Sequence, residues 1–273
     1  MKTVVHRYLT QAKTTVQPPG FADFLRGTIA VYQFSKQYNY TLKIDIDSHP
    51  IFKLLDIPSE FAVKVDPSED TLELFPTEIN YNDMPTIIET MFRKNEDFTI
   101  YTNAFYKNTS DMSDEYNFMK LLLTPSIELE RHSNTVKNNI AIDFLKPYTV
   151  IHVRLGDTPL LYKTGVQDDC VNRIRTYIEI VKRQYEQILL ISDSSDLKNK
   201  VSDLCSTTTS IPIHLGSLDT GDIDIRLLDT LSEFSIMSKS ESIHCMNYYG
   251  GPGSGFSRIC SMIYSIPYYC ITL

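Results

Sequence analysis

The sequence predicts an α/β protein with two halves, each built on a parallel β-sheet that helices cover. Apolar runs of strand length alternate with helical patterns along the 273 residues, and repeated strand–helix–strand units give parallel strands joined by right-handed crossovers. The apolar class makes up 42% of the chain, which is enough for a sizeable core. The charged class makes up 22%, which is too small a share for a disordered chain.

The first half is expected to span residues 1–145 and to begin with a strand over 3–9. The segment Pro18–Gly20 then breaks regular structure. A helix is expected over 21–38, because its apolar residues recur mostly at steps of three and four. The further elements expected here are a strand over 40–46, a short helix over 51–55, strands over 61–65 and 98–102, helices over 116–123, 127–138 and 140–145, and loops or solvated faces over 66–73 and 108–115.

The second half is expected to span residues 146–273 and to be more regular. It opens on an apolar run over 149–155, which is typical of a strand buried in a parallel sheet. The other elements expected here are helices over 170–185, 195–204, 224–237 and 254–266, and strands over 187–191, 211–214, 242–246 and 268–271. In open sheets of this class, ligands bind at the carboxyl ends of the strands.

Charge and hydropathy exclude several classes of protein. The 26 basic and 34 acidic residues give a net charge of −8, which argues against binding to the phosphate backbone of a nucleic acid. No run of about 18 apolar residues is present to span a membrane, and the N-terminus lacks the apolar stretch of a signal peptide. We therefore expect a cytoplasmic protein without a membrane span, whose five cysteines are reduced and mostly buried.

One candidate site lies at the end of the strand over 149–155, where the sequence reads His152-Val153-Arg154-Leu155-Gly156-Asp157. Arg154 can hold a pyrophosphate with two parallel hydrogen bonds. Gly156 lets the chain turn and approach a ligand closely, and Asp157 can fix the arginine or cap the next segment. The alternative is an ordinary strand end with an Arg–Asp pair at the surface.

A second candidate is the segment Gly250–Ser257, which holds four of the ten glycines and precedes a predicted helix. A glycine-rich turn at a helix N-terminus presents backbone N–H groups and the positive end of the helix dipole to an anion. Ser254 and Ser257 add hydroxyl donors. The segment is not a P-loop, because no Lys-Ser or Lys-Thr follows it. A plain loop with Ser254 as the helix cap is the structural alternative.

A third candidate is the segment Gly20–Gly27 at the start of the first predicted helix. Asp23 and Arg26 lie three residues apart in its first turn and are therefore neighbours. Taken alone, this pattern is explained by an acidic residue at a helix N-terminus, where the helix dipole favours a negative charge.

Together these segments resemble the fucosyltransferase superfamily, which includes the α1,2-, α1,6- and protein O-fucosyltransferases. The resemblance extends from about residue 5 to about residue 267, although residues 60–140 match no motif of the group. It rests on four motifs in order: the glycine-bearing loop Gly20–Gly27, His-x-Arg-x-Gly-Asp at His152–Asp157, Ser192-Asp193-Ser194 after the next strand, and Ser254–Ser257 at the start of a late helix.

The resemblance implies a GT-B fold, in which two Rossmann-like domains with parallel sheets face a central cleft that holds the active site. It implies an inverting glycosyltransferase that moves a sugar from a nucleotide-sugar donor to a hydroxyl of an oligosaccharide or a glycoprotein glycan. Neither a metal ion nor another cofactor is implied. Residues 1–145 would form the acceptor-side domain, and residues 146–273 would bind the donor.

The resemblance also implies roles for individual residues. Arg154 would hold the β-phosphate and stabilise the leaving nucleoside diphosphate. Asp23 replaces the asparagine that is usual in the group, and its carboxylate is a candidate for the base that deprotonates the acceptor. The donor-binding residues implied are Gly20, Arg26, His152, Arg154, Gly156, Asp157, Asp193, Asp229, Ser254, Gly255, Phe256 and Ser257. Asp45 and Asp47 are the next candidates for the base.

Three alternatives stay open. The superfamily mostly uses GDP-fucose, but UDP-xylose is a second possible donor and would make the chain a xylosyltransferase. A non-catalytic relative that binds nucleotide sugars or glycans would keep the fold, although the presence of Arg154 favours the enzyme. Finally, the pairs Asp45/Asp47 and Asp222/Asp224 have the Asp-x-Asp spacing of metal-dependent glycosyltransferases, whose oxygen ligands suit Mn²⁺. Strands and helix starts produce this spacing as well.

Overall fold

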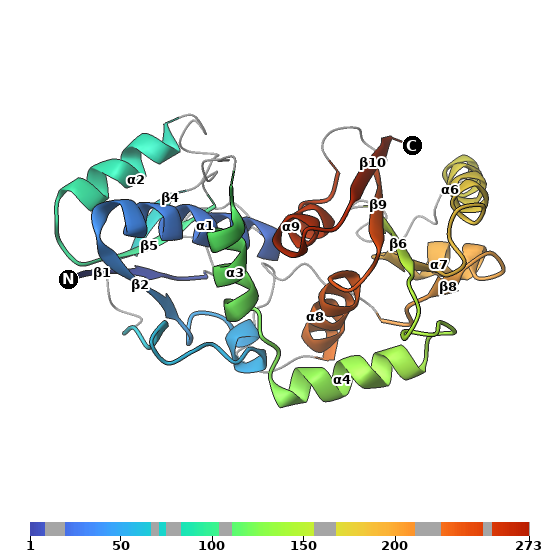
Figure 1. The fold of residues 1–273 in the computed structure, drawn as a ribbon, viewed down its shortest axis with the longest axis horizontal. Coiled ribbons are helices and arrows are strands. Elements are labelled where there is room, and N and C mark those ends of the chain that lie inside the picture. The colour runs from blue at the N-terminus through green and yellow to red at the C-terminus, as the bar shows by residue number, and fades with distance from the viewer. Residues whose placement is uncertain are drawn as a thin grey trace. The chain divides into compact units, whose positions relative to one another are not determined.

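Figure 1 shows the computed structural model of the chain, which describes residues 1–8, 20–66, 71–74, 83–103, 111–155, 168–210, 225–247 and 253–272. The described residues form two compact units, Met1–Ser126 and the combination of Ile127–Ile213 with Asp224–Leu273. Each unit contains a five-stranded sheet, and the pairings between its named strands are parallel. The predicted α/β class with two parallel sheets is therefore confirmed.

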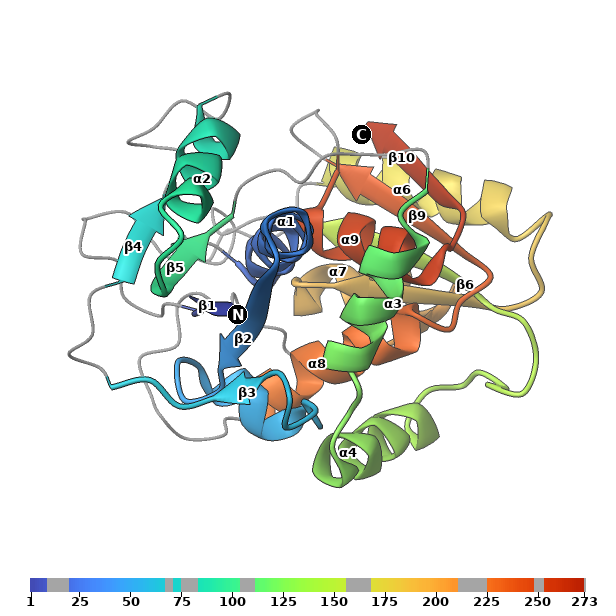
Figure 2. The same cartoon turned by 60° about the vertical axis from the view of Figure 1, so that its left-hand side comes forward.

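The first unit places its first strand at the centre of its sheet. Its elements are β1 (Lys2–His6), α1 (Phe21–Tyr38), β2 (Tyr40–Asp45), the 3₁₀ helix η1 (Pro50–Leu54), β3 (Ala62–Val63), β4 (Thr71–Leu74), α2 (Met84–Arg93), β5 (Phe98–Thr102) and α3 (Ser113–Leu122). The strand order is β3-β2-β1-β5-β4, which can be followed in Figure 2. The backbone of β1 therefore pairs with β2 on one side and with β5 on the other.

The second unit has the doubly wound topology of nucleotide-binding folds. Its elements are α4 (Ile127–Asn138), β6 (Thr149–Arg154), α6 (Asp168–Val181), β7 (Ile188–Ser192), α7 (Ser195–Val201), β8 (Ser206–Thr207), α8 (Ile225–Met237), β9 (Ser242–Asn247), α9 (Gly255–Tyr264) and β10 (Tyr268–Thr272). The strand order is β10-β9-β6-β7-β8. Figure 1 shows α6 and α7 on one face of this sheet and α8 and α9 on the other.

Buried apolar side chains hold the second sheet between these helices. On the face of α6 and α7, Ile151 and Val153 of β6 pack with Ile174 and Ile178 of α6 and with Leu197 of α7.

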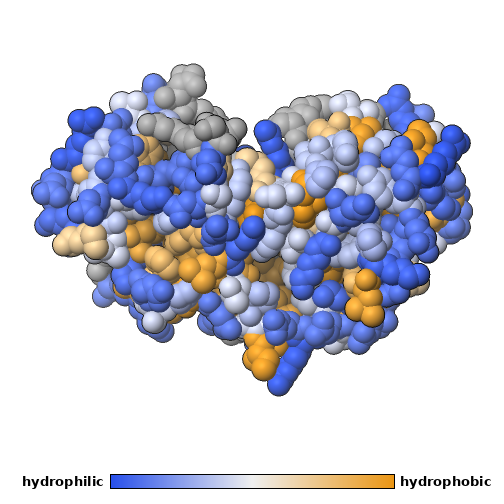
Figure 3. Space-filling model, in the orientation of Figure 1, coloured by the Kyte–Doolittle hydropathy of each residue, from blue (hydrophilic) through white to orange (hydrophobic). Residues whose placement is uncertain are grey.

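The surface is different in character, since hydrophilic residues cover most of the face shown in Figure 3. None of the described helices combines the length and the apolar composition needed to cross a membrane.

Most predicted elements are present, but α2, β4 and β8 were not predicted. β4 and β8 lie at sheet edges, where one side of a strand stays open and polar residues are tolerated. The acidic stretch 66–73 was predicted as a loop or solvated face, and its last three residues begin β4. α2 carries Met84, Ile87, Ile88, Met91 and Phe92 at the spacing of an amphipathic helix, so the sequence contained a signal for this helix that the prediction missed. The strand predicted over 211–214 lies outside the described residues.

Two predicted helices have a different structure. The segment 51–55 forms the 3₁₀ helix η1, whose first turn is capped by the side chain of His49. The segment 140–145 forms turns in place of a helix. There the Asp143 carboxylate accepts a hydrogen bond from the backbone N–H of Leu145 at 3.0 Å, and such a local bond competes with helix formation.

The division between the units falls before α4, whereas the sequence led us to expect it at residue 145. The reason is that α4 packs along α8 of the second unit. The hydroxyl oxygens of Ser133 and Ser232 lie 2.9 Å apart in this buried contact. A helix joins the domain against which it buries its apolar side, and the sequence of α4 alone does not identify that partner.

Helix α1 lies in direct contact with the end of β5. A Cβ atom added to Gly27 would lie 1.7 Å from the backbone carbonyl oxygen of Thr102. His6 of β1 fills the space beside this contact, because its ring stacks on Phe24 at 4.8 Å and its Nδ1 lies 3.1 Å from the hydroxyl of Thr28. Gly27 therefore fixes the first turns of α1 against the centre of the first sheet.

We predict that Gly27→Ala destabilises the protein by at least about 2 kcal/mol, because a backbone carbonyl cannot move aside cheaply. In an exposed helix position, a change from glycine to alanine would raise the free energy of unfolding by about 0.5–1 kcal/mol. The sign of the change therefore distinguishes a close contact from an open position. Chemical denaturation measures the effect. Gln37→Ala, at an exposed position of the same helix, is the control and should change stability by less than about 0.5 kcal/mol. A neutral Gly27→Ala would contradict the close contact.

Candidate active site

The second sheet has its topological switch point between β6 and β9. From β6 the chain continues to β7 and β8 on one side, and it then returns to β9 and β10 on the other. Because the connections diverge there, the carboxyl ends of β6 and β9 leave a crevice open for a ligand. Arg154 ends β6 and is in register with Asn247, the last residue of β9. The sequence therefore predicted correctly that Arg154 lies at a strand end.

His152 lies two residues earlier on β6, and its side chain is 6% exposed. Its Nδ1 atom has no hydrogen-bond partner among the described residues. Burial, followed by the nearby charges of Arg154 and Lys198, lowers the pKa of His152 to about 3. The imidazole is therefore neutral at physiological pH and holds one buried nitrogen ready for a partner. Leaving such an atom unpaired costs about 1–3 kcal/mol, which a hydrogen-bonding ligand would recover.

Asp193 and Ser194 shape the same edge of the sheet. The Asp193 carboxylate accepts a hydrogen bond from the backbone N–H of Leu155 at 3.0 Å, so it holds the chain where β6 ends. Ser194 is the N-cap of α7, and its hydroxyl accepts from the backbone N–H of Leu197. The predicted donor contact of Asp193 stays a prediction. The structure shows that this carboxylate also positions the segment that follows Arg154.

The N-terminal turn of α9 follows β9. Its first intrahelical bond runs from the N–H of Arg258 to the carbonyl of Ser254, so the N–H groups of Gly255, Phe256 and Ser257 have no acceptor within the helix. Ser254 occupies the N-cap position, yet its hydroxyl makes no cap hydrogen bond. This arrangement presents N–H donors and the positive end of a helix dipole, as an anion site requires.

Of the next residues in this turn, Ser257 is buried and Phe256 is half-buried. Ser257 is fully buried, and its hydroxyl donates to the carbonyl of Ser254 at 3.3 Å. The ring of Phe256 lies 6.0 Å from that of His152 and 5.1 Å from that of Phe234. Phe256 thus fastens α9 to β6 and α8. Gly156 and Asp157, the remaining donor-binding residues predicted on this edge, lie outside the described residues.

A buried network of Lys198, Glu233, Thr208 and Ser210, which was not predicted from the sequence, lies behind the site. The ammonium group of Lys198 donates to the Thr208 hydroxyl at 2.9 Å and to the Ser210 carbonyl at 2.7 Å, and it lies 3.6 Å from the Glu233 carboxylate. Glu233 accepts from the hydroxyls of Thr208 and Ser210. Burial lowers the pKa of Lys198 and raises that of Glu233, and their attraction opposes both shifts. A lysine and a glutamate this distant in sequence carry no local signal of pairing.

Asp229 lies on α8, one turn before Glu233. Its Oδ1 atom is 2.7 Å from Nε2 of His132, which α4 contributes. Both side chains are largely buried. The sequence predicted Asp229 as a donor contact and assigned His132 no role. In the structure His132 orients the Asp229 carboxylate, whose contact with a donor stays a prediction.

In the first unit, Gly20, Asp23 and Arg26 come together at the start of α1. Gly20 is the N-cap, and its backbone N–H donates to Oδ2 of Asp23 at 3.0 Å. Oδ1 of Asp23 is ion-paired with Arg26. Both oxygens of the carboxylate are therefore engaged, as expected for a helix-capping aspartate.

The two reserve candidates for the base differ sharply in environment. Asp45 is 1% exposed, lies 2.9 Å from the Arg7 guanidinium, and accepts hydrogen bonds from the backbone N–H groups of Asp47 and Val65. It holds β1, β2 and the segment after β3 together. Asp47 lies about half exposed beside Lys64 at 3.1 Å. Asp45 is thus a structural residue, and Asp47 alone of the two is open to solvent.

Among the described residues, no group of three or more His, Cys, Asp or Glu side chains is arranged to hold a metal ion. The Asp45/Asp47 pair is split between a buried ion pair and an exposed carboxylate. Asp222 and Asp224 lie outside the described residues.

Two buried polar groups at the centre of the first sheet also escaped the sequence analysis. Asn103 directly follows β5 and is 4% exposed, yet its side-chain oxygen has no hydrogen-bond partner in the described part of the chain. The hydroxyl of Tyr8, just after β1, is likewise unpartnered, while its ring is stacked between Phe24 and His49. Buried polar atoms are rarely left unpaired, so both mark positions where a hydrogen-bonding ligand would be stabilised.

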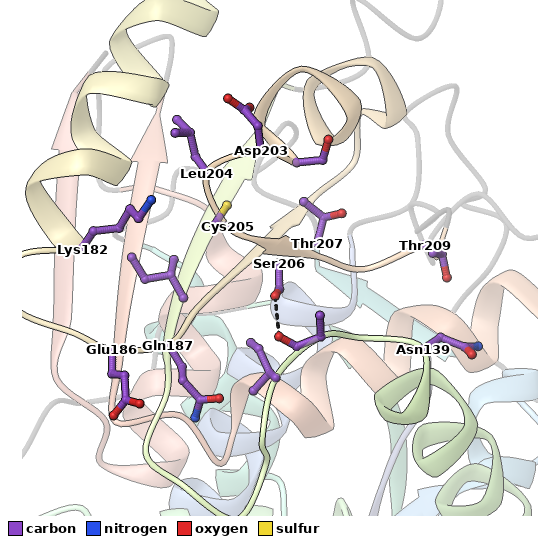
Figure 4. A pocket seen from close by; sticks show the side chains of 14 residues that line it. Asn139, Lys182, Glu186, Gln187, Asp203, Leu204, Cys205, Ser206, Thr207 and Thr209 are labelled. Atoms are coloured by element: carbon purple, nitrogen blue, oxygen red, sulfur yellow. Dashed lines mark hydrogen bonds between the residues drawn. The ribbon is translucent and has the colours of Figure 1, made fainter.

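A pocket of about 550 Å³ lies at the opposite, amino-terminal ends of β7 and β8 (Figure 4). Polar side chains and backbone line it, and the hydroxyl of Ser206 donates to the carbonyl of Ala141 across it. Asp203 on its wall is held by Arg175 through two hydrogen bonds of 2.7 Å. The pocket contains none of the residues predicted to act on a donor.

Solved structures with the same architecture are fucosyltransferases. Fucosyltransferase NodZ from Bradyrhizobium superposes with a TM-score of 0.54 at 15% identity, covering 96% of this chain and 93% of that one. POFUT1 in complex with GDP gives 0.53 at 10% identity, with 99% and 98% covered. A variant of Arabidopsis thaliana FUT1 in complex with GDP gives 0.61 at 11% identity, with 98% and 70% covered.

The chain has the GT-B fold of the fucosyltransferases. The resemblance drawn from four short motifs is therefore confirmed at the level of the fold. No family model and no curated protein sequence matches the chain. At 10–15% identity, the likeness is one of architecture.

We predict that Lys198→Met destabilises the second unit by about 3–5 kcal/mol, because it leaves the Glu233 carboxylate buried without its cation. The double variant Lys198→Met/Glu233→Leu should be less destabilised than the sum of the two single changes by at least about 1 kcal/mol. Denaturant titration gives each value. Lys200→Met, which removes a more exposed partner of Asp196 on the same helix, should cost less than about 1 kcal/mol. Strict additivity would show that Lys198 and Glu233 do not interact.

Proposed function

We propose that the protein is an inverting glycosyltransferase, which transfers fucose from GDP-fucose to a hydroxyl of an oligosaccharide or glycoprotein glycan without a metal ion. The observation that carries the proposal is the arrangement of the second unit. Arg154 ends β6 at the topological switch point of the second sheet. The unpartnered Nδ1 atom of the buried His152 and the N-terminus of α9, which a glycine precedes, lie at the same edge of this sheet. The fold likeness to fucosyltransferases, some of them in complex with GDP or GDP-fucose, supports the same function.

The donor diphosphate would be neutralised by the protein itself. Arg154 would donate two hydrogen bonds to phosphate oxygens, and the N–H groups of Gly255 and Phe256 would supply further donors at the positive end of α9. As the bond to the sugar breaks, negative charge grows on the leaving diphosphate. Donors already fixed in place stabilise this charge more than that of the intact donor, which lowers the barrier.

The nucleoside would lie against His152 and Asp229. The unpartnered Nδ1 of His152 needs a hydrogen-bonding group, and a nucleobase edge supplies one. His132 holds the Asp229 carboxylate, whose acceptor oxygens suit the N–H donors of guanine. The ion pair of Lys198 and Glu233 would keep α7 and α8 in place around the bound nucleoside.

The acceptor hydroxyl is a poor nucleophile at neutral pH and benefits from a base. We propose Asp23 for this role. Its carboxylate is about one-quarter exposed and forms an ion pair with Arg26. Each carboxylate oxygen has two lone pairs, so Asp23 can accept the proton while it keeps its contacts with Gly20 and Arg26.

UDP-xylose is the alternative donor, and a non-catalytic nucleotide-sugar binder is the alternative class. Incubation with GDP-fucose or UDP-xylose and a glycan acceptor separates these functions through the release of GDP or UDP. A donor present at 100 times its Kd raises the free energy of unfolding by about 2.7 kcal/mol. Stabilisation without release would favour the binder, and release of UDP from UDP-xylose alone would favour the xylosyltransferase.

We predict that Arg154→Ala lowers kcat/KM by about 10²–10³, because it removes a charge-assisted donor to the leaving group. Arg154→Lys should fail similarly, since an ammonium group cannot copy the guanidinium fork. Nucleoside diphosphate release is the measurement, and Tm is the check on folding. Arg173→Ala, an exposed arginine of α6, is the matched control. Normal turnover by either Arg154 variant would exclude a role for this side chain.

We predict that Asp23→Asn lowers kcat by at least about 10², with donor affinity nearly unchanged, because the amide cannot take a proton. If Asp23 only caps α1, the change should cost about 1 kcal/mol of stability or less and leave kcat intact. Single-turnover transfer and GDP titration separate the two results. Should transfer proceed at the normal rate, Asp47→Asn is the next variant to test.

A further inference from the structure

Two cysteines face each other across neighbouring strands of the second sheet. β9 and β10 pair in parallel, and Cys245 is the register partner of Cys270. Register partners on neighbouring strands point to the same face, and neighbouring strands lie about 4.8 Å apart. A disulfide requires a Cα–Cα distance of about 4.4–6.8 Å, and the usual spacing of neighbouring strands lies within this range.

The two sulfur atoms converge on one point beside Gly253. A Cβ atom added to Gly253 would lie 3.0 Å from Sγ of Cys245 and 3.1 Å from Sγ of Cys270. The φ angle of Gly253 is +83°, a conformation that favours glycine. Both thiols therefore lie close to Gly253, the residue that precedes the N-cap of α9. Neither cysteine is part of a disulfide bond in the structure.

The two thiols differ in access, as a stepwise exchange requires. Cys270 is exposed on the edge strand β10, whereas Cys245 is fully buried. A small disulfide can therefore reach Cys270 first, and the neighbouring Cys245 can then resolve the adduct. Burial and the neighbouring Cys245 raise the pKa of Cys270, while Arg258 opposes the shift.

We propose that Cys245 and Cys270 form a dithiol modification site, which a low-molecular-weight disulfide such as glutathione disulfide converts into an intrachain bond. The Cys270 thiolate attacks one sulfur of the reagent and releases one thiolate. The Cys245 thiolate then attacks Sγ of Cys270 in the mixed disulfide and releases the second. Two protein thiols are oxidised, one disulfide is reduced to two thiols, and two protons pass from protein to product.

The bond would act on the anion-binding turn of α9. In the reduced protein, the backbone N–H of Ser254 donates to Sγ of Cys245 at 3.2 Å. Drawing this sulfur to bonding distance from Cys270 withdraws it from the backbone N–H of Ser254, the N-cap residue of α9. This consequence rests on the proposed function, because it assumes that the N–H groups of α9 bind the phosphates of the donor. Oxidation would therefore weaken donor binding.

The experiment treats the full chain with glutathione disulfide in mildly alkaline buffer and maps the peptides by mass spectrometry without reduction. We expect a Cys245–Cys270 crosslink that dithiothreitol reverses. GDP titration before and after oxidation should show a loss of affinity of about fivefold, the effect of one hydrogen bond. Cys270→Ser should abolish both effects and keep the affinity of the reduced protein. Cys205→Ser, a half-buried thiol elsewhere in the unit, should change neither.

Glutathione retained on Cys270 without a crosslink, or a crosslink to another cysteine, would overturn the site. A Cys245–Cys270 bond that leaves GDP affinity unchanged would overturn its coupling to α9. If the protein binds neither GDP nor UDP before oxidation, yet forms the Cys245–Cys270 bond on oxidation, the proposed function is refuted and the dithiol site is confirmed. The two proposals therefore fail in distinguishable ways.

Discussion

The pairing of β6 with β9 is the constraint on which the second unit depends. The two strands are separated along the chain by α6, β7, α7, β8 and α8, yet Thr149–Arg154 lies in register with Ser242–Asn247. Parallel strands cannot be joined by a tight turn, so the chain between them must be packed into helices on the sheet faces. Once they pair, Arg154, His152 and the start of α9 share one edge, and Cys245 comes to lie between β6 and β10.

The cost of burying polar groups distinguishes the structural parts of this unit from the parts open to a ligand. Lys198 and Glu233 are buried, but both make hydrogen bonds, because Thr208 and Ser210 bind the ammonium group and the Thr208 hydroxyl also donates to the carboxylate. His152 is buried with one nitrogen unpaired. A satisfied network holds α7 and α8 in one arrangement, whereas an unpaired atom gains free energy when a ligand arrives. The first unit repeats the contrast, with Asp45 and Arg7 paired and Asn103 unpaired.

Local sequence patterns predicted the elements that are long or fully buried. α1 and α4 begin and end where their apolar spacing indicates, and β6 is recognisable as a buried, largely apolar run. Apart from the ten-residue helix α2, the failures were short or polar, such as the edge strand β4 and the segment 140–145, where the Asp143 side chain competes with a helix. At those places local preferences are weak, and the neighbouring elements decide the conformation.

The sequence by itself determined the class of fold and the order of the motifs, because strand and helix periodicity and glycine placement are local properties of a chain. It also placed Arg154 at a strand end and glycines before α9. Only the tertiary structure decided that His132 orients Asp229, that Lys198 pairs with Glu233, and that Cys245 meets Cys270. These contacts join residues that are distant along the chain. Their energies depend on burial and on distances that exist only after the strands have paired and the helices have closed over them.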